Sequence, residues 1–289
     1  MDNSLPPVHI KRLYLDHVID HDTVLYNTNN HYNDEGMEQP EDYHEKISRG
    51  RTKNWIHKFH GTYHVIVLSE PYDLYWMREA VQIGMITGNF SHIYDDELND
   101  LCDKYEHLFP SEGKWFVRTD RVSLKEGMHG KGPYTDFRSM IQSSVSSGHG
   151  HLAFNPKDTE IHFYLVPWIE IDGNKEFRIF VHNNHITAIS SQHLYKINTW
   201  LNTLSDMEIT KVVHKIITYF NNHIKDKMSY MGDYTMDLAL VGPDDTPYFI
   251  EPNSFGKYYA AGSALFHWVY DHDTLYESDT IEIRYCNKY

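Results

Sequence analysis

Alternating charged and apolar positions in the second half of the chain predict a β-hairpin. Residues 176–181 (EFRIFV) follow this period-two pattern, and residues 185–190 repeat it. Asn183 and Asn184 separate the two runs, and asparagine tolerates the positive φ angles of a two-residue hairpin turn. We therefore expect two antiparallel strands joined by a tight turn.

A helix and a second hairpin are predicted further along the chain. Ser205 and Glu208 have the S-x-x-E spacing of a capping box, and the apolar residues after them recur on one helical face as far as Ile224. Residues 234–241 and 248–251 are apolar runs on either side of a turn rich in Gly, Pro and Asp. They predict the last hairpin.

The first third of the chain has a weaker pattern. Residues 18–47 are polar and lack apolar periodicity, which is typical of a long loop or a partly ordered segment. Residues 63–68 (YHVIVL) predict a short buried strand. A helix is expected from Asp73, as its cap, through Ile83, and Gly84 is expected to end it.

Two further strands, at residues 114–119 and 161–171, complete the expected elements. Strands outnumber helices in the second half and hairpins dominate, so the predicted fold class is α+β with largely antiparallel sheet. We expect a partly irregular N-terminal region, residues 1–113, which contains a small α/β lobe near residues 55–110. The remaining region, residues 114–289, is expected to form the second part of the protein.

Composition narrows the possible partners. The 289 residues include 26 Lys and Arg against 41 Asp and Glu, which gives a net charge of −15. Such a field repels nucleic acid and anionic lipid, so we expect neither as a partner. Cys102 and Cys286 lack C-x-x-C spacing, which is typical of a reducing compartment. The chain shows no signal-peptide pattern and no apolar run of about 20 residues, so a soluble cytoplasmic protein is expected.

Two acidic residues in the last hairpin suggest a metal site. Asp237 and Glu251 are equally distant from the turn near Asp244, so they should lie opposite each other on one face, with Asn253 two residues beyond Glu251. Opposed like charges are destabilising unless a cation neutralises them. Two carboxylates and an amide oxygen suit magnesium rather than zinc. Alternatively, the register is shifted by one residue and one carboxylate faces solvent.

At this hairpin the sequence resembles a known family. The pattern of an acidic residue, a turn and then (I/V)-(D/E)-x-N resembles the magnesium-binding end of ATP-grasp proteins. Residues 114–268 resemble, more closely, the cell division cycle protein 123 family, which is a branch of that superfamily. The similar segments occur in the family's order: WFVRTDRVSLKEG, LVPWIEIDGNKEFRIFVHNNHITAISSQ, MDLALVGPDDTPYFIEPNSFG and SALFHW.

The resemblance implies an ATP-grasp fold, with two α+β lobes and the nucleotide between them, and a set of ligand contacts. ATP phosphates would be bound by Arg118, Lys125 and Arg178. The adenine edge would be read by the backbone at Trp168 and Ile169, and Glu170 would accept from the ribose hydroxyls. Magnesium would be held by Asp237, Glu251 and Asn253.

The chain departs from the family pattern at three positions. The family's Arg-Lys pair before the hinge tryptophan is replaced by Val166 and Pro167, so one basic contact to the nucleotide is either missing or supplied from elsewhere, by Lys131 or Lys257. Glu251 stands where the family has Asp, and Ser254 where it has Pro. Glu is the common residue in catalytic ATP-grasp ligases, so magnesium binding is expected to survive.

Two functions are therefore expected of the protein, both with ATP and magnesium as cofactors. The first is an assembly chaperone that acts on translation initiation factor two through its γ subunit. The second is an ATP-dependent ligase that joins a carboxylate to an amine through an acyl-phosphate. A structural module without ATP is a third possibility. The loop GMHGKG lacks P-loop spacing, and GHGH at residues 148–151 lacks the further ligands of a zinc site, so neither changes this view.

Overall fold

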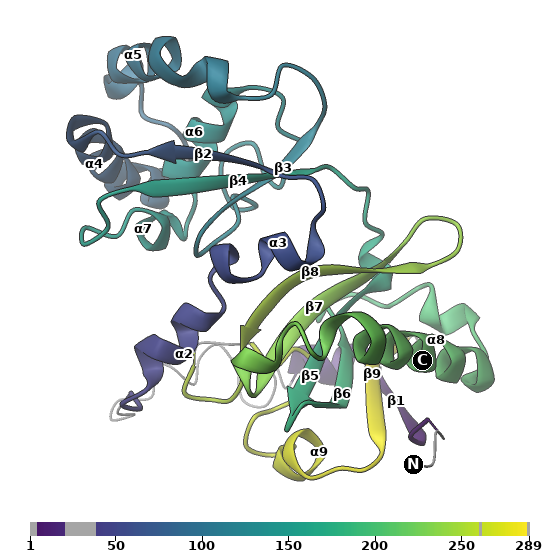
Figure 1. Cartoon of the computed structure of the whole chain (residues 1–289). Coiled ribbons are helices and arrows are strands. Elements are labelled where there is room, and N and C mark those ends of the chain that lie inside the picture. Colours follow the sequence, from purple (N-terminus) through teal and green to yellow (C-terminus); the bar gives the residue numbers. More distant parts are fainter. Residues whose placement is uncertain (1–4, 21–38, 260–261, 288–289) are drawn as a thin grey trace. The chain divides into compact units, whose positions relative to one another are not determined.

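A computed structural model describes residues 5–20, 39–259 and 262–287 of the chain. It divides the protein into two compact units (Figure 1). Residues 51–169 form one of them, which we call the middle unit. Residues 1–50 and 170–289 together form the other, which we call the split unit because the middle unit interrupts its sequence. Each unit is described by itself.

The middle unit contains a three-stranded antiparallel sheet, and its long helices pack against one face of that sheet. Its strands are β2 (His64–Leu68), β3 (Trp115–Thr119) and β4 (Ile161–Pro167), in the order β2-β4-β3. Its helices are η3 (Thr52–Asn54), α3 (Ile56–Phe59), α4 (Pro71–Thr87), η4 (His92–Tyr94), α5 (Asp95–Tyr105), η5 (Glu106–Leu108), α6 (Phe137–Ser146) and α7 (Gly150–Ala153). One hydrophobic core joins the sheet to α4, α5 and α6.

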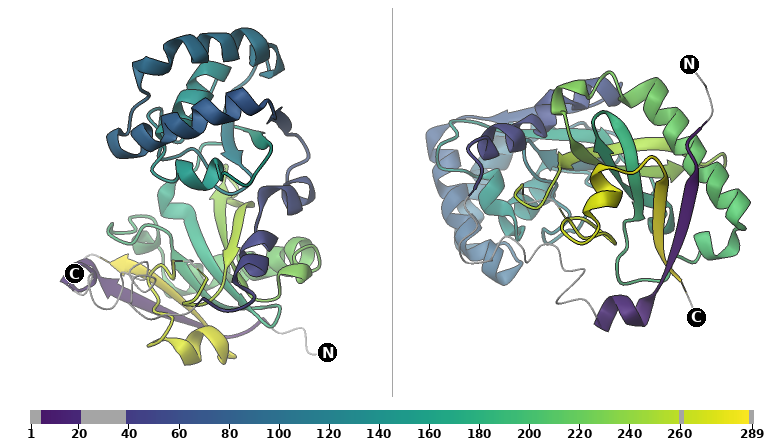
Figure 2. Two further views of the ribbon diagram at one scale, coloured as in Figure 1. Left: turned by 90° about the vertical axis from the view of Figure 1, so that its left-hand side faces the viewer. Right: turned by 90° about the horizontal axis from the view of Figure 1, so that it is seen from below.

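The split unit contains a six-stranded sheet of order β1-β9-β6-β5-β7-β8. These strands are β1 (Val8–Tyr14), β5 (Glu176–His182), β6 (His185–Ser191), β7 (Tyr234–Val241), β8 (Thr246–Ser254) and β9 (Ile281–Asn287). The β1–β9 and β6–β9 pairs are parallel and the other pairs are antiparallel. In Figure 2 the two ends of the described chain, purple β1 and yellow β9, run side by side.

The helices of the split unit surround this sheet. They are α1 (Leu15–Asp20), α2 (Tyr43–Arg49), η6 (Gly173–Lys175), η7 (Leu201–Thr203), α8 (Asp206–Tyr219), the π-helical turn η8 (Phe220–Ile224), η9 (Ser229–Met231) and α9 (His272–Tyr276). The longest of them, α8, contacts both edge strands, β1 and β8. None of the helices in the described part of the chain is long and apolar enough to span a membrane.

The local patterns that sequence analysis used are present where they were expected. Asn183 and Asn184 have φ angles of 49° and 60° and form the turn between β5 and β6. Ser205 and Glu208 form the full capping box of α8. Hairpin β7–β8 is present as well. The predicted fold class, α+β with largely antiparallel sheets, is therefore confirmed.

The expected end of α4 was wrong. The helix starts after Glu70 and continues through Gly84 to Thr87, and Gly88, with φ of 67°, terminates it. A Cβ atom on Gly84 would lie 2.0 Å from the backbone oxygen of Val145 on α6. Gly84 is thus a close-packing residue between two helices rather than a helix terminator, and a single sequence does not distinguish these roles.

The boundaries between the two compact units differ from the boundary expected between residues 113 and 114. β3 follows that expected boundary, yet it pairs with β4, which pairs in turn with β2. The boundaries between the two compact units therefore lie between residues 50 and 51 and between residues 169 and 170 of the sequence. The strand expected at residues 161–171 ends at Pro167. The segment 18–47, expected to be a loop, lies largely outside the described residues, and its last part belongs to α2.

Candidate functional site

The hairpin β7–β8 brings the two predicted acidic ligands together. Asp237 is the direct cross-strand partner of Glu251, so the predicted register is confirmed and the shifted alternative is wrong. A β-bulge lies between Asp237 and Leu238. On its turn side the pairing register is shifted by one residue, so that Leu238 pairs with Phe249. Asp237 is 2% exposed. A carboxylate this deeply buried requires a cation or several hydrogen bonds.

Arg178 supplies that cation. It lies on β5 directly opposite Asp237 on β7. Its Nε donates to Asp237 Oδ1 at 2.9 Å, and one terminal nitrogen donates to Oδ2 at 2.8 Å, while the other donates to Gly262 O at 2.9 Å. Burial, the largest single influence, would lower the pKa of Arg178, but the charge and hydrogen bonds of Asp237, together with the charges of Glu251 and Glu176, outweigh it and the pKa is raised. One of the two opposed negative charges, that of Asp237, is therefore neutralised by the protein itself.

Two amide side chains complete the surroundings of Asp237. The side-chain amide groups of Asn253 and Gln192 point at its Oδ2, at 3.5 Å and 3.4 Å. Gln192 was missed from sequence, although it is the last residue of the segment that carries the family resemblance. The structure thus joins Arg178 to the three predicted magnesium ligands.

The donor set around Asp237 suits magnesium. Asp237 Oδ2 accepts from Arg178, Gln192 and Asn253, whereas Oδ1 accepts from Arg178 alone, so a lone-pair position of Oδ1 remains for a cation. Glu251 and Asn253 can add a carboxylate and an amide oxygen, which are ligands for a hard cation. The described residues contain no cluster of three or more His, Cys, Asp or Glu that could hold a metal ion. Asp237 and Glu251 are only two such residues, and the third predicted ligand, Asn253, is an amide.

Arg118 lies in the middle unit in an enclosed environment. It is 4% exposed, its Nε donates to Thr52 Oγ1 at 2.9 Å, and its guanidinium lies 4.7 Å from the ring centre of Trp55. Burial, with the Arg118 charge added, lowers the pKa of nearby His60 from 6.5 to about 4. Sequence reasoning missed Thr52, Trp55 and His60, which precede the segment of family resemblance.

The other predicted phosphate contact, Lys125, is exposed on the loop after β3. Its neighbour Glu126 forms an ion pair with His149 at 2.5 Å between Oε2 and Nδ1. His149 belongs to the GHGH motif, and among the described residues this motif is not part of any group of three or more His, Cys, Asp or Glu that could hold a metal. Lys125 and Arg118 are both in the middle unit, and the structure shows no direct contact between them in the part of the chain that it describes.

The predicted adenine contacts follow the end of β4. The backbone amide of Trp168 donates to Lys114 O at 2.8 Å, so this group is already used within the middle unit. Ile169, the next residue, is 36% exposed. The Lys131 amine lies 6.0 Å from the Trp168 ring centre, which places a positive charge near the expected hinge. Glu170, the first residue of the second part of the split unit, is exposed.

Comparison with known proteins now adds to this geometry. A model of the D123 family matches residues 137–289, more than half of the chain. The chain belongs to the D123 family. The match contains the predicted adenine contacts, Arg178 and the whole β7–β8 hairpin, whereas Arg118 and Lys125 precede it. The expected kinship with the cell division cycle protein 123 family is therefore confirmed.

The relatives that resemble this chain are named Cdc123 or CDC123-like. A CDC123-like protein of Acanthamoeba polyphaga mimivirus is 28% identical over 211 residues, which are 68% of this chain and 59% of the viral protein. Cdc123 of Schizosaccharomyces pombe has a TM-score of 0.56 at 15% identity, over 85% of this chain and 98% of that one. A C-terminally truncated form gives 0.55 at 16% identity. These two likenesses show that the chain has the fold of Cdc123.

Proposed function

We propose that this D123 protein binds ATP with magnesium and acts as an assembly chaperone for translation initiation factor two, through the γ subunit. One observation carries the nucleotide half of the proposal. Asp237, Glu251 and Asn253 gather hard oxygen ligands on adjacent strands beside Arg178, inside the region that matches the family. Family membership supports the chaperone half.

In this proposal the residues of the split unit hold the metal. Asp237 and Glu251 would ligate magnesium, Asn253 would add its amide oxygen, and Arg178 would keep Asp237 in position through its two hydrogen bonds. Magnesium, when bound, neutralises phosphate charge and links the nucleotide to the protein. Glu170 would accept from the ribose.

The middle unit carries the other predicted contacts, Arg118, Lys125 and Ile169. Arg118 and Lys125 would face phosphate oxygens, and a guanidinium can bind two such oxygens at once. The Trp168 amide is used by Lys114 O, so the adenine edge would be read by the backbone of Ile169.

Calorimetric titration with ATP tests the nucleotide half. We expect binding in magnesium and a strong loss of affinity in EDTA. Glu251→Gln keeps the shape of the side chain and removes one ligand charge, so ATP affinity in magnesium should fall at least tenfold. Glu277→Gln, an exposed residue of the same unit, is the matched control and should bind like the wild type. Equal affinity in magnesium and EDTA would refute the proposed metal site.

Two further assays separate the chaperone from a ligase. The chaperone function predicts a complex with purified γ subunit that is stronger in ATP and magnesium than in EDTA. The ligase alternative is favoured by Glu251, the residue that is common in catalytic ATP-grasp enzymes. It predicts continuous release of ADP and phosphate when an acid and an amine are added together. Turnover without γ-subunit binding would replace the chaperone by the ligase.

A further inference from the structure

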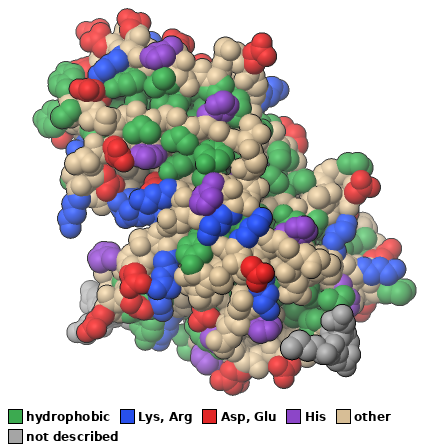
Figure 3. Space-filling model, viewed as in Figure 1, with side chains coloured by type: hydrophobic (Ala, Val, Ile, Leu, Met, Phe, Trp, Pro, Cys, Tyr) green, Lys and Arg blue, Asp and Glu red, His purple; other side chains and the backbone are tan. Residues whose placement is uncertain are grey.

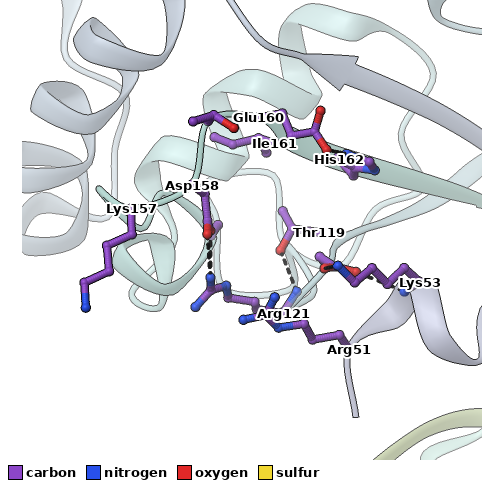
Figure 4. A pocket seen from close by; sticks show the side chains of 12 residues that line it. Arg51, Lys53, Thr119, Arg121, Lys157, Asp158, Glu160, Ile161 and His162 are labelled. Atoms are coloured by element: carbon purple, nitrogen blue, oxygen red, sulfur yellow. Dashed lines mark hydrogen bonds and ion pairs between the residues drawn. The ribbon is translucent and has the colours of Figure 1, made fainter. Parts of the chain in front are cut away.

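A cavity in the middle unit contains none of the predicted nucleotide contacts. It has a volume of about 260 Å³ and lies where β3 ends and β4 begins. Figure 4 shows the side chains around it, and Figure 3 shows Lys and Arg side chains gathered on this part of the surface, beneath α7. Four of its lining residues are basic, namely Arg51, Lys53, Arg121 and Lys157.

The acidic residues of the cavity are already paired. Asp158 accepts from a terminal nitrogen of Arg121 at 2.7 and 2.9 Å. Asp120 pairs with Lys53, whose Nζ is 3.8 Å from Oδ2 and whose backbone amide donates at 2.9 Å. The third acid, Glu160, is 2.7 Å from a ring nitrogen of His162. The carboxylates around the cavity are thus directed towards neighbouring side chains.

Arg51 and Lys157 remain as cations without an acidic partner. Within the described parts of the chain, the side chain of neither residue forms an ion pair or a hydrogen bond, although both line the cavity. In Figure 4, Arg51 lies on the same side of the cavity as Arg121, and Lys157 lies beyond Asp158. Four basic and three acidic side chains line the cavity, so with neutral histidine its lining has a net charge of +1, in a protein whose net charge is −15.

The position of the cavity separates it from the expected adenine contacts. His162 lines the cavity near the start of β4, whereas Trp168 follows the end of that strand. Six residues of extended chain span about 20 Å. Arg118 lies between these positions in the β3–β4 register, but it is directed at Thr52 and Trp55 and does not line the cavity.

We propose that this cavity binds a phosphate dianion, either inorganic phosphate or the phosphate group of a small phosphomonoester. Two negative charges would offset Arg51 and Lys157. Arg121, held by Asp158, retains further N–H groups and can donate to the same oxygens. The small volume suits a compact phosphate group rather than a nucleic-acid backbone. This site is independent of the proposed ATP site.

Titration of inorganic phosphate into the whole protein, at constant ionic strength, tests the proposal. The double variant Arg51→Gln, Lys157→Gln removes both unpaired charges and leaves every ion pair of the cavity in place. We expect at least a tenfold loss of phosphate affinity in this variant. Lys114→Gln, an exposed residue of the same unit outside the cavity, is the control and should bind as the wild type does. An unchanged thermal midpoint shows that the double variant is folded.

Two results would overturn the inference. Phosphate affinity in the double variant within twofold of the wild type would mean that the cavity does not bind the anion. Loss of phosphate binding when ATP and magnesium are saturating would mean that the cavity holds the phosphates of ATP itself. Parallel titrations with glycerol 3-phosphate distinguish a phosphomonoester from inorganic phosphate. The phosphate titration can be carried out even if the protein does not bind ATP. Failure of the proposed ATP binding can therefore be distinguished from failure of the proposed phosphate site.

Discussion

The replacement Asp237→Asn reverses an expectation that the sequence alone would give. Viewed as one of two opposed acids, Asp237 should be relieved of repulsion by this change, and the protein should be as stable or slightly more stable. The structure predicts the opposite. Asp237 is 2% exposed and accepts two charge-assisted hydrogen bonds from Arg178, whose side chain is 14% exposed. Neutralising Asp237 therefore leaves a buried guanidinium without its counter-charge.

The size of the effect follows from this pair. Removing one partner of a buried ion pair costs about 3–5 kcal/mol, since the remaining charge loses its compensation. Asparagine preserves the shape and one acceptor oxygen, so we expect a loss of about 2–4 kcal/mol in the free energy of unfolding. For a unit of this size each 1 kcal/mol shifts the thermal midpoint by about 2–4 °C, which predicts a decrease of roughly 4–16 °C.

Urea and thermal unfolding without nucleotide measure this loss. Asp245→Asn is the matched control, because Asp245 also pairs with a cation, Lys175, but in a more exposed position. Asparagine suits its φ angle of 50°, so this control should cost about 1 kcal/mol or less. Adding Arg178→Gln to Asp237→Asn should restore part of the stability, with a coupling of about 1–3 kcal/mol.

One outcome would refute this reasoning. If Asp237→Asn melts at or above the wild-type temperature while Asp245→Asn behaves as expected, repulsion between Asp237 and Glu251 outweighs the Arg178 pair. The sequence-based expectation would then be correct, and the role given to Arg178 would be wrong.

Three further predictions concern other parts of the fold. Burial lowers the pKa of His60 from 6.5 to about 4, so its contribution to stability is complete above pH 6.5 and is lost as the pH falls towards 4. The loss should reach roughly 3 kcal/mol in pH-dependent urea unfolding, and a His60→Gln variant with the same slope would contradict it. Gly84→Ala should cost about 3 kcal/mol or more because its Cβ meets backbone at 2.0 Å, while Gly61→Ala, with nothing within 4 Å, should change stability by less than about 1 kcal/mol. Cys102 and Cys286 are buried with raised pKa values, so a thiol reagent should label them in denaturant and leave them unlabelled in buffer; rapid labelling of the native protein would refute this.

Local sequence determined those features that depend on neighbours along the chain. Two asparagines between alternating runs specify the β5–β6 turn, because they adopt positive φ angles at little cost. The S-x-x-E spacing specifies the start of α8, because each side chain bonds the other's backbone. The opposition of Asp237 and Glu251 also belongs here, since their distance from the turn sets the register.

Tertiary structure decided the features that depend on pairing between distant segments. Arg178 meets Asp237 only because β5 pairs with β7, across 59 positions of sequence, and no turn fixes that register. Parallel β1 and β9 were missed for the same reason, because their pairing joins the first and last described strands. Gly84 resembles a helix end in sequence, and only the approach of α6 shows why a side chain is excluded there. Sequence periodicity shows which face of an element is apolar, but the elements that cover that face, and the charges they bring, are fixed by the packing of the whole unit.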